Sequence, residues 1–90
     1  MSTSREDQVY LEHILEAAGK AARYLSGMGQ EAFRKYTLVQ DGVIRQVEII
    51  GEAAKRVSPE FRSAHPDIPW QDMAGMRDKL IHDYFCVDIM

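Results

Sequence analysis

The chain is 90 residues long, which suits one small domain near the lower size limit for a self-sufficient hydrophobic core. Its residues are 46% hydrophobic and 28% charged, as in an ordinary globular protein, and no apolar run is long enough to cross a membrane. The net charge of −3 argues against a general nucleic-acid binder, because such proteins carry a basic stripe along the phosphate backbone.

Cysteine and histidine usage narrows the chemistry further. The only cysteine is Cys86, so no internal disulfide can form and the chain suits a reducing compartment. His13, His65 and His82 lack the spacing of metal ligands, and we expect neither a metal ion nor a cofactor. No apolar signal core follows Met1, so the expected location is cytoplasmic and away from membranes.

The first expected helix starts after Thr3 or Ser4, either of which can cap it, and ends at Gly27. Apolar residues recur along it at helical spacing and predict one buried face. That face consists of Leu11, Ile14, Leu15, Ala18, Ala22 and Leu25. His13 lies off this face, beside two glutamates, and is expected to be solvated.

A short helix over residues 30–39 and a long helix over residues 41–58 should follow. Phe33 and Tyr36 are the expected buried residues of the short helix. The long helix has one apolar face, formed by Val43, Val47, Ile50, Ala54 and Val57. Pro59 is expected to stop this helix, because proline disfavours the helical conformation of the residue before it.

Gly51 and Glu52 stand out within the long helix. A glycine in mid-helix costs about 1 kcal/mol against alanine, so Gly51 suggests the close approach of another helix. Glu52 has two interpretations. The more frequent outcome is a Glu52 that is solvated or paired with Arg56 one turn later. The other is a carboxylate that orients an active-site arginine or histidine.

Pro66 and Pro69 make residues 61–69 an extended connection. Pro69 is well placed at the start of the next helix, whose inward side chains recur at helical spacing as Trp70, Met73, Met76 and Leu80. Gly75 interrupts this helix and is expected either to kink it or to let another backbone or a ligand come near.

The stretch 76–85 is the one place where a cation, an imidazole, carboxylates and a phenol crowd on a helical pattern. Asp78 and His82 are one turn apart, so the carboxylate is expected to hold the imidazole. Arg77 and His82 are separated by about 140° around the helix and about 7.5 Å along it. A site that uses both must lie at the helix edge or at a seam with a second copy of the helix, which favours a homodimer.

Arg77 offers a rigid fork of N–H donors for phosphate oxygens, and His82 can take or return a proton near neutral pH. These groups suffice for RNA cleavage without a metal ion, in which the 2′-hydroxyl attacks the adjacent phosphate. The Arg-x4-His spacing alone is not specific, because it arises by chance in many chains.

Three linked motifs make the pattern specific. They are Gly51-Glu52-Ala53-Ala54-Lys55-Arg56, then Ile68-Pro69-Trp70, then Gly75-Met76-Arg77-Asp78-Lys79-Leu80-Ile81-His82-Asp83-Tyr84-Phe85. In this order and spacing they resemble the HepT-like branch of the HEPN domain superfamily. The resemblance covers roughly the last half of the chain, and the first helix matches in type only.

The resemblance implies that residues 1–90 form a single all-α domain, an up-and-down helical bundle of the HEPN type. Family members continue for another helix past the position of Met90, so the chain is expected to be truncated at its C-terminus. Members of the family form homodimers or higher oligomers and act as toxins that cleave RNA without metal. Their partner is an MntA-like minimal nucleotidyltransferase antitoxin.

The resemblance also assigns roles to individual residues. Arg77 would stabilise the phosphate, His82 would be the acid and base, and Asp78 would support them. The antitoxin would transfer AMP onto Tyr84 and so block the site, while Glu52 remains a candidate supporting residue from its position in the helix.

Two other functions stay open at this point. The first is a non-catalytic adaptor of a nucleotidyltransferase, which the acidic balance of the chain suits. The second is a helical bundle in which Arg77 and His82 form only surface ion pairs. A toxic phenotype that His82→Ala removes would identify the nuclease. Stable co-purification with the transferase regardless of His82 would favour the adaptor.

Overall fold

The computed structural model describes the backbone of residues 4–84 and the side chains of residues 4–82. All regular structure in this part of the chain is helical, which confirms the all-α class. The helices are α1 (Arg5–Leu25), α2 (Gln30–Lys35), α3 (Thr37–Arg56), α4 (Pro59–Ala64), α5 (Trp70–Ala74) and α6 (Met76–Tyr84). Within residues 4–84, none of them combines the length and the hydropathy that a bilayer crossing requires.

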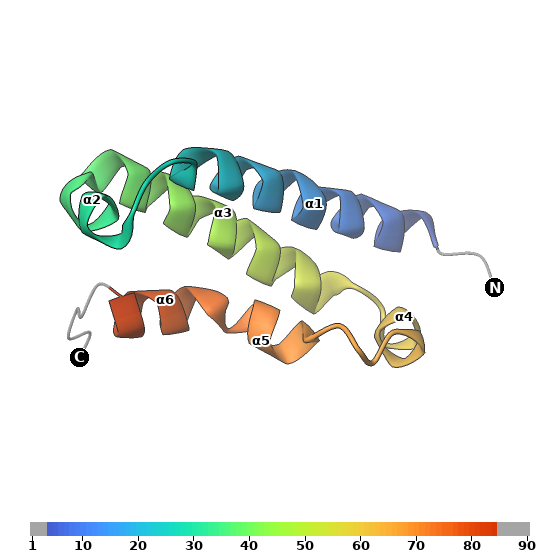
Figure 1. Ribbon diagram of the computed structural model, residues 1–90. Helices are drawn as coiled ribbons and strands as arrows, with labels where there is room; N and C mark the ends of the chain where they lie inside the picture. The colour runs from blue at the N-terminus through green and yellow to red at the C-terminus, as the bar shows by residue number, and fades with distance from the viewer. Residues whose placement is uncertain (1–3, 85–90) are drawn as a thin grey trace.

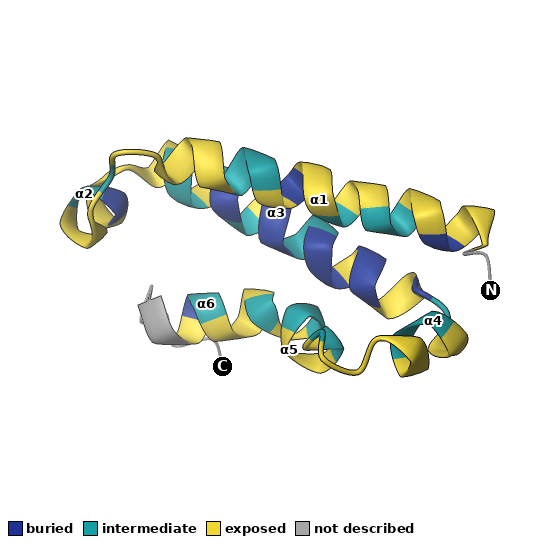
Figure 2. Ribbon diagram, turned by 45° about the vertical axis from the view of Figure 1, so that its right-hand side comes forward, coloured by how far each residue is buried: buried dark blue, intermediate teal, exposed yellow. Residues whose placement is uncertain are grey.

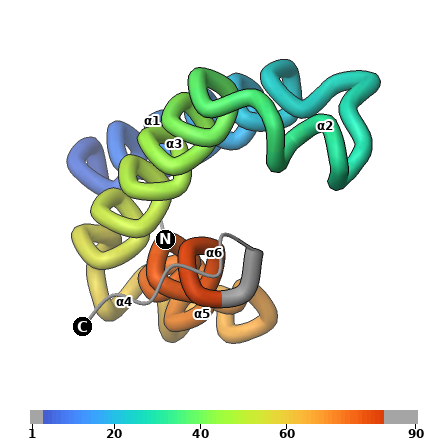
Figure 3. The backbone as a smooth tube through the Cα atoms, turned by 90° about the vertical axis from the view of Figure 1, so that its left-hand side faces the viewer, coloured from blue at the N-terminus to red at the C-terminus, as the bar shows by residue number. Residues whose placement is uncertain are grey.

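Helix α3 is the centre of the arrangement. Figure 1 shows α1 running antiparallel along one side of α3 and the α5–α6 pair returning along the other side, with α2 and α4 at the two ends. The end-on view in Figure 3 places α1 beside α3 and the α5–α6 pair below it. Helix α3 packs against α1, α2, α5 and α6. This alternation of direction is the expected up-and-down bundle.

The buried face of α3 matches the sequence pattern. Figure 2 shows dark patches of buried residues that recur along most of this helix, between teal and yellow ones. All five residues of the predicted apolar face are buried, and Val57, which directly follows α3, is only 1% exposed. Phe33 of α2 packs with Val43 and Val47, and Met76 and Leu80 of α6 pack against the same cluster. The core therefore ties the last helix to the middle of the chain.

The predicted buried face of α1 is partly wrong. Leu15 is 72% exposed, and Ala18, Ala22 and Leu25 are also exposed. The buried apolar residue of α1 is instead Ala17, whose small side chain suits a close contact between helices. The apolar stripe of the sequence is wider than the arc that a single neighbouring helix can cover, so one edge of the stripe stays in solvent.

The start of α1 carries a polar link that the sequence pattern did not reveal. Ser4 caps the helix as expected, its hydroxyl accepting from the Asp7 N–H at 3.1 Å. The Asp7 carboxylate is 4% exposed and accepts from the N–H of Ser58 at 2.8 Å and from its hydroxyl at 2.6 Å. Asp7 thus joins the N-terminus of α1 to the junction between α3 and α4.

Four predicted boundaries are corrected. The short helix ends at Lys35, and α3 already begins at Thr37. Tyr36 forms the bend between them and is exposed, since its side chain belongs to neither helix face. Helix α3 ends at Arg56, and Pro59 begins α4 rather than only ending α3, because proline fits the first turn of a helix. Residues 59–64 are therefore helical, and the extended connection shortens to residues 65–69.

Gly51 marks a close helix contact, as predicted. A Cβ atom at this position would lie 3.2 Å from the carbonyl oxygen of Ala74 and 3.3 Å from that of Met73. Both oxygens belong to α5, so the missing side chain sets the distance between α3 and α5. This contact fixes the register of the chain that leads into α6.

Candidate functional site

Helix α6 presents its polar residues outward because its apolar residues are held in the core. Gly75 ends α5, its N–H donating to the carbonyl of Gln71 at 3.1 Å, and α6 restarts at Met76. The predicted interruption at Gly75 is therefore a break between two helices. Ile81 is buried, while Arg77 and His82 are exposed.

Arg77 is held by two carboxylates. Its Nε donates to Glu48 of α3 at 2.8 Å, and its Nη1 contacts the Asp78 carboxylate at 3.2 Å. The Arg77 side chain is 45% exposed and that of Glu48 is 37% exposed, so the group is accessible from solvent. A guanidinium has five N–H donors. The donors that these two contacts do not use are available on this half-exposed side chain and suit a phosphate oxygen.

The carboxylate that orients Arg77 is Glu48 and not Glu52. Glu52 lies one turn further along α3, lines the same groove, and makes no ion pair with Arg77 or Arg56 within residues 4–82. Sequence spacing could not choose between the two glutamates, because the choice depends on how α6 lies along α3. That register follows from the Gly51 contact with α5.

The expected pair of Asp78 and His82 does not form in this structure. Asp78 contacts its neighbour Arg77 instead, and within residues 4–82 the His82 ring makes no hydrogen bond or ion pair. Asp78 contacts Arg77 because a carboxylate binds a permanently charged guanidinium strongly. His82 is an exposed imidazole on the outer side of α6.

Tyr84 lies in the last turn of α6, two residues after His82. Its side chain is outside the described residues, as is Cys86. The predicted common face of Arg77 and Tyr84 therefore stays a prediction.

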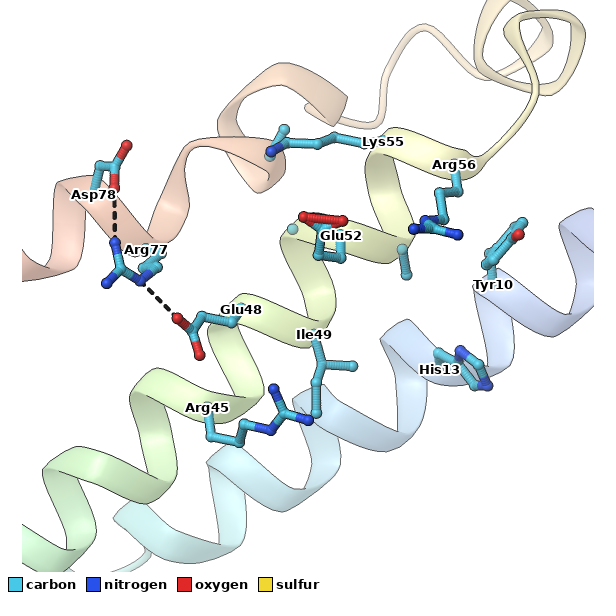
Figure 4. Close-up of a pocket in the computed structure, with 13 residues that line it drawn as sticks. Tyr10, His13, Arg45, Glu48, Ile49, Glu52, Lys55, Arg56, Arg77 and Asp78 are labelled. Atoms are coloured by element: carbon cyan, nitrogen blue, oxygen red, sulfur yellow. Dashed lines mark hydrogen bonds and ion pairs between the residues drawn. The ribbon is translucent and has the colours of Figure 1, made fainter.

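A groove of about 680 Å³ runs beside Arg77. Figure 4 shows its floor on α3, with Tyr10 and His13 on the α1 side and Arg77 and Asp78 on the α6 side. His13 is exposed, as the sequence predicts, but its place in this wall depends on how α1 packs against α3 and could not be predicted from the sequence. The charged lining residues of α3 are Arg45, Glu48, Glu52, Lys55 and Arg56. His82 is not part of this lining.

Metal-binding groups are not assembled in the described part of the chain. Among residues 4–82, no cluster of three or more His, Cys, Asp or Glu side chains is placed to hold an ion. The arrangement offers instead an arginine fork for an anion and, on the same helix, an imidazole that can move protons.

Comparison with known proteins agrees with the motifs. The chain is 46% identical over 79 residues to a protein of Caldanaerobacter subterraneus subsp. tengcongensis that is named provisionally as an RNase, covering 88% of this chain and 70% of the relative. It is 46% identical over 89 residues to the probable ribonuclease HepT of Thermococcus cleftensis, covering 99% of this chain and 79% of the relative. A provisionally named RNase of Methanocaldococcus jannaschii is 38% identical, covering 96% and 71%. No solved structure gives a significant match.

The family model described as "Ribonuclease HepT-like" matches residues 14–90, which include α3, α5 and α6 and all the residues of the three motifs. The match confirms the resemblance to the HepT-like branch of the HEPN superfamily that the motifs indicated. The chain belongs to the ribonuclease HepT-like family.

Proposed function

We propose that this chain is an endoribonuclease that cleaves RNA without a metal ion and is the toxin of a toxin–antitoxin pair. The observation that carries the proposal is the anchored Arg77, which Glu48 and Asp78 hold at the edge of a groove with N–H donors left over. Family membership and the ribonuclease names of the relatives support RNA as the substrate.

In the proposed reaction, the 2′-oxygen of a ribose forms a bond to the adjacent phosphorus and the bond from phosphorus to the 5′-oxygen breaks. His82 takes the proton of the 2′-hydroxyl, and an imidazolium returns a proton to the leaving 5′-oxygen. Arg77 stabilises the negative charge that builds on the phosphorane oxygens. The products are a 2′,3′-cyclic phosphate and a 5′-hydroxyl, and Asp78 supports the reaction by steadying Arg77.

A homodimer would complete the site. Arg77 and His82 leave α6 about 140° apart, so one copy does not direct both at a single phosphate. A two-fold dimer repeats the helix and can bring His82 of one copy to Arg77 of the other. It also supplies two imidazoles, one to act as the base and one as the acid.

Control by an MntA-like nucleotidyltransferase antitoxin is part of the proposal. Transfer of AMP from ATP to the Tyr84 hydroxyl, which releases pyrophosphate, would add bulk and negative charge to α6 two residues from His82. The added phosphate would compete with RNA for Arg77. Mass spectrometry of the chain co-expressed with its transferase should show one AMP addition, which Tyr84→Phe removes. An unmodified wild-type chain would contradict this control.

The test of the nuclease is cleavage of a labelled RNA oligonucleotide by purified protein in the presence of a metal chelator. Wild type and Tyr84→Phe should cut the RNA and leave a 2′,3′-cyclic phosphate. Arg77→Ala and His82→Ala should not, while Lys79→Ala, an exposed cation of the same helix, serves as the control. An RNA with 2′-deoxyribose at the cut position should resist. Cleavage that survives in His82→Ala would contradict the assigned role.

The non-catalytic adaptor is the second candidate, and one observation favours it. Leu15 and Leu25 leave an apolar strip of α1 in solvent on a chain of net charge −3, a surface better suited to a protein than to RNA. If this candidate is right, His82→Ala should co-purify with the transferase as wild type does, and the RNA oligonucleotide should stay intact with every variant.

A further inference from the structure

The groove beside Arg77 has the opposite charge balance to the whole chain. Four of its lining residues are cations and three are carboxylates, whereas the chain has a net charge of −3. Two of these carboxylates, Glu48 and Asp78, are already bonded to Arg77. Glu52 is therefore the one lining carboxylate left to offset the positive charges of Arg45, Lys55 and Arg56.

Besides Arg77, the lining carries two further exposed guanidinium groups, those of Arg45 and Arg56. Within residues 4–82, neither makes an ion pair or a side-chain hydrogen bond. Figure 4 shows both side chains directed toward the α1 side of the groove, while Arg77 reaches in from α6. Guanidinium forks without a carboxylate partner in a groove are suited to binding phosphate.

The spacing of these arginines fits a chain of phosphates. Arg45 and Arg56 are eleven residues apart on one face of α3, which places them about 16 Å apart along the helix axis. Glu48, the residue that anchors Arg77, lies between them in the helix. Arg77, held by Glu48, therefore reaches the groove from the α6 side at a level between Arg45 and Arg56, which lie toward the α1 side.

The α1 wall adds aromatic rings to this groove. Tyr10 and His13 both line the groove, with ring centroids 6.4 Å apart and the rings at 76° to each other. Unstacked bases of single-stranded RNA pack on such rings, whereas the bases of a duplex remain stacked on one another. Cations on the floor and rings on one wall suit a single strand.

We propose that this groove binds a single RNA strand, with Arg45 and Arg56 of α3 gripping phosphates on either side of the one held by Arg77. This inference rests on the proposed ribonuclease function and adds the path of the substrate. Tyr10 and His13 receive the unstacked bases. The overall negative charge of the chain then limits RNA binding to this groove, so the protein grips its substrate locally.

The test is RNA binding in a His82→Ala background, which leaves the strand uncut. A fluorescently labelled, unstructured single-stranded RNA is titrated at several salt concentrations. Adding Arg45→Gln and Arg56→Gln together should raise Kd about tenfold or more, and should reduce the slope of log K against log salt by about 1.4, because each lost phosphate contact on a single strand removes about 0.7.

The matched control changes two exposed arginines outside the groove, Arg23→Gln and Arg34→Gln, and alters the net charge by the same amount. This control should leave the salt slope unchanged. Equal losses of RNA affinity in the two double variants would overturn the proposal, because net charge alone would then govern binding. Displacement of the RNA by an equal concentration of AMP would also overturn it, since the groove would then be a mononucleotide site.

Cleavage by the wild-type chain, measured separately, distinguishes this inference from the proposed function. If wild type cuts RNA but the Arg45 and Arg56 substitutions leave binding unchanged, the groove proposal fails and the nuclease stands. If wild type does not cut RNA and the two substitutions still raise Kd about tenfold or more, the nuclease fails and the groove remains an RNA-binding site. Thermal melts of both double variants check that the fold is kept.

Discussion

Asp7 and Ser58 are 51 residues apart in the sequence, yet the Asp7 carboxylate accepts hydrogen bonds from both the hydroxyl and the backbone N–H of Ser58. The hydroxyl bond, followed by the N–H bond, lowers the pKa of Asp7 from its ordinary value of 3.8, and burial of the carboxyl opposes the shift. Because Ser58 also caps α4, this one contact joins the start of α1 to the end of α3 and the start of α4.

Asp7→Asn should lower the free energy of unfolding at neutral pH, and its effect should shrink in acid. A carboxyl whose pKa is lower in the folded state contributes its stability in full above the unfolded value of 3.8, and loses it as the pH falls toward the folded pKa. Urea unfolding of wild type and Asp7→Asn from neutral pH to about pH 3 measures this difference. Asp41→Asn, which alters an exposed carboxyl, is the control. A difference that stays constant with pH would refute a role for the Asp7 charge.

Gly51 and Gly19 should respond in opposite ways to alanine. Both lie inside helices, where alanine is favoured over glycine by about 1 kcal/mol. At Gly19 the nearest atom to an added Cβ is 3.7 Å away, at the end of a flexible arginine, so Gly19→Ala should stabilise the chain by about that amount.

At Gly51 the added Cβ meets backbone oxygens of α5 at 3.2 and 3.3 Å, which have little room to move. In Gly51→Ala this steric conflict should outweigh the higher helix propensity of alanine, so the variant should melt at a lower temperature than wild type. The substitution should also displace α5 and α6. Equal stabilisation by both substitutions would show that α5 yields easily and does not set the register of Arg77.

Much of this fold could be predicted from the sequence because α3 is surrounded. Helices pack against it on several sides, so its apolar periodicity identified Val43 and Val57 as core residues. Helix α1 contacts α3 on one side only, and its wider stripe misplaced Leu15. The Arg-x4-His motif was visible as a local pattern. Glu48 was not, because its role depends on the register of two helices far apart in the chain.

Leu15→Ala and Val57→Ala test the corrected core. Leu15 is 72% exposed, so its truncation should change the free energy of unfolding by less than about 0.5 kcal/mol. Val57 is 1% exposed, and its truncation should cost about 2 kcal/mol from lost burial and the cavity left behind. Urea denaturation curves measure both. A large fall in the free energy of unfolding of Leu15→Ala, without a change in the association state, would mean that Leu15 is buried, as the apolar stripe of α1 predicts.

Glu48→Gln should lower kcat and KM together. The carboxylate of Glu48 fixes the Arg77 guanidinium through a 2.8 Å ion pair, and the neutral amide would hold it less firmly. A weaker hold on the transition state by about 1.4 kcal/mol would reduce kcat about tenfold. Removal of a negative charge from the groove should at the same time tighten RNA binding. Because the pair is half-exposed, the free energy of unfolding should change by less than about 1 kcal/mol.

Glu52→Gln is the matched comparison for Glu48→Gln, since it removes the same charge from the same groove without touching Arg77. Steady-state cleavage of the RNA oligonucleotide should show a lower KM for both variants, but a much larger fall in kcat for Glu48→Gln. Equal falls in kcat would mean that the groove needs negative charge in general and that Glu48 does not position Arg77. A fall in thermal stability confined to Glu48→Gln would assign this residue to the fold instead, because positioning of an exposed arginine leaves the melting temperature almost unchanged.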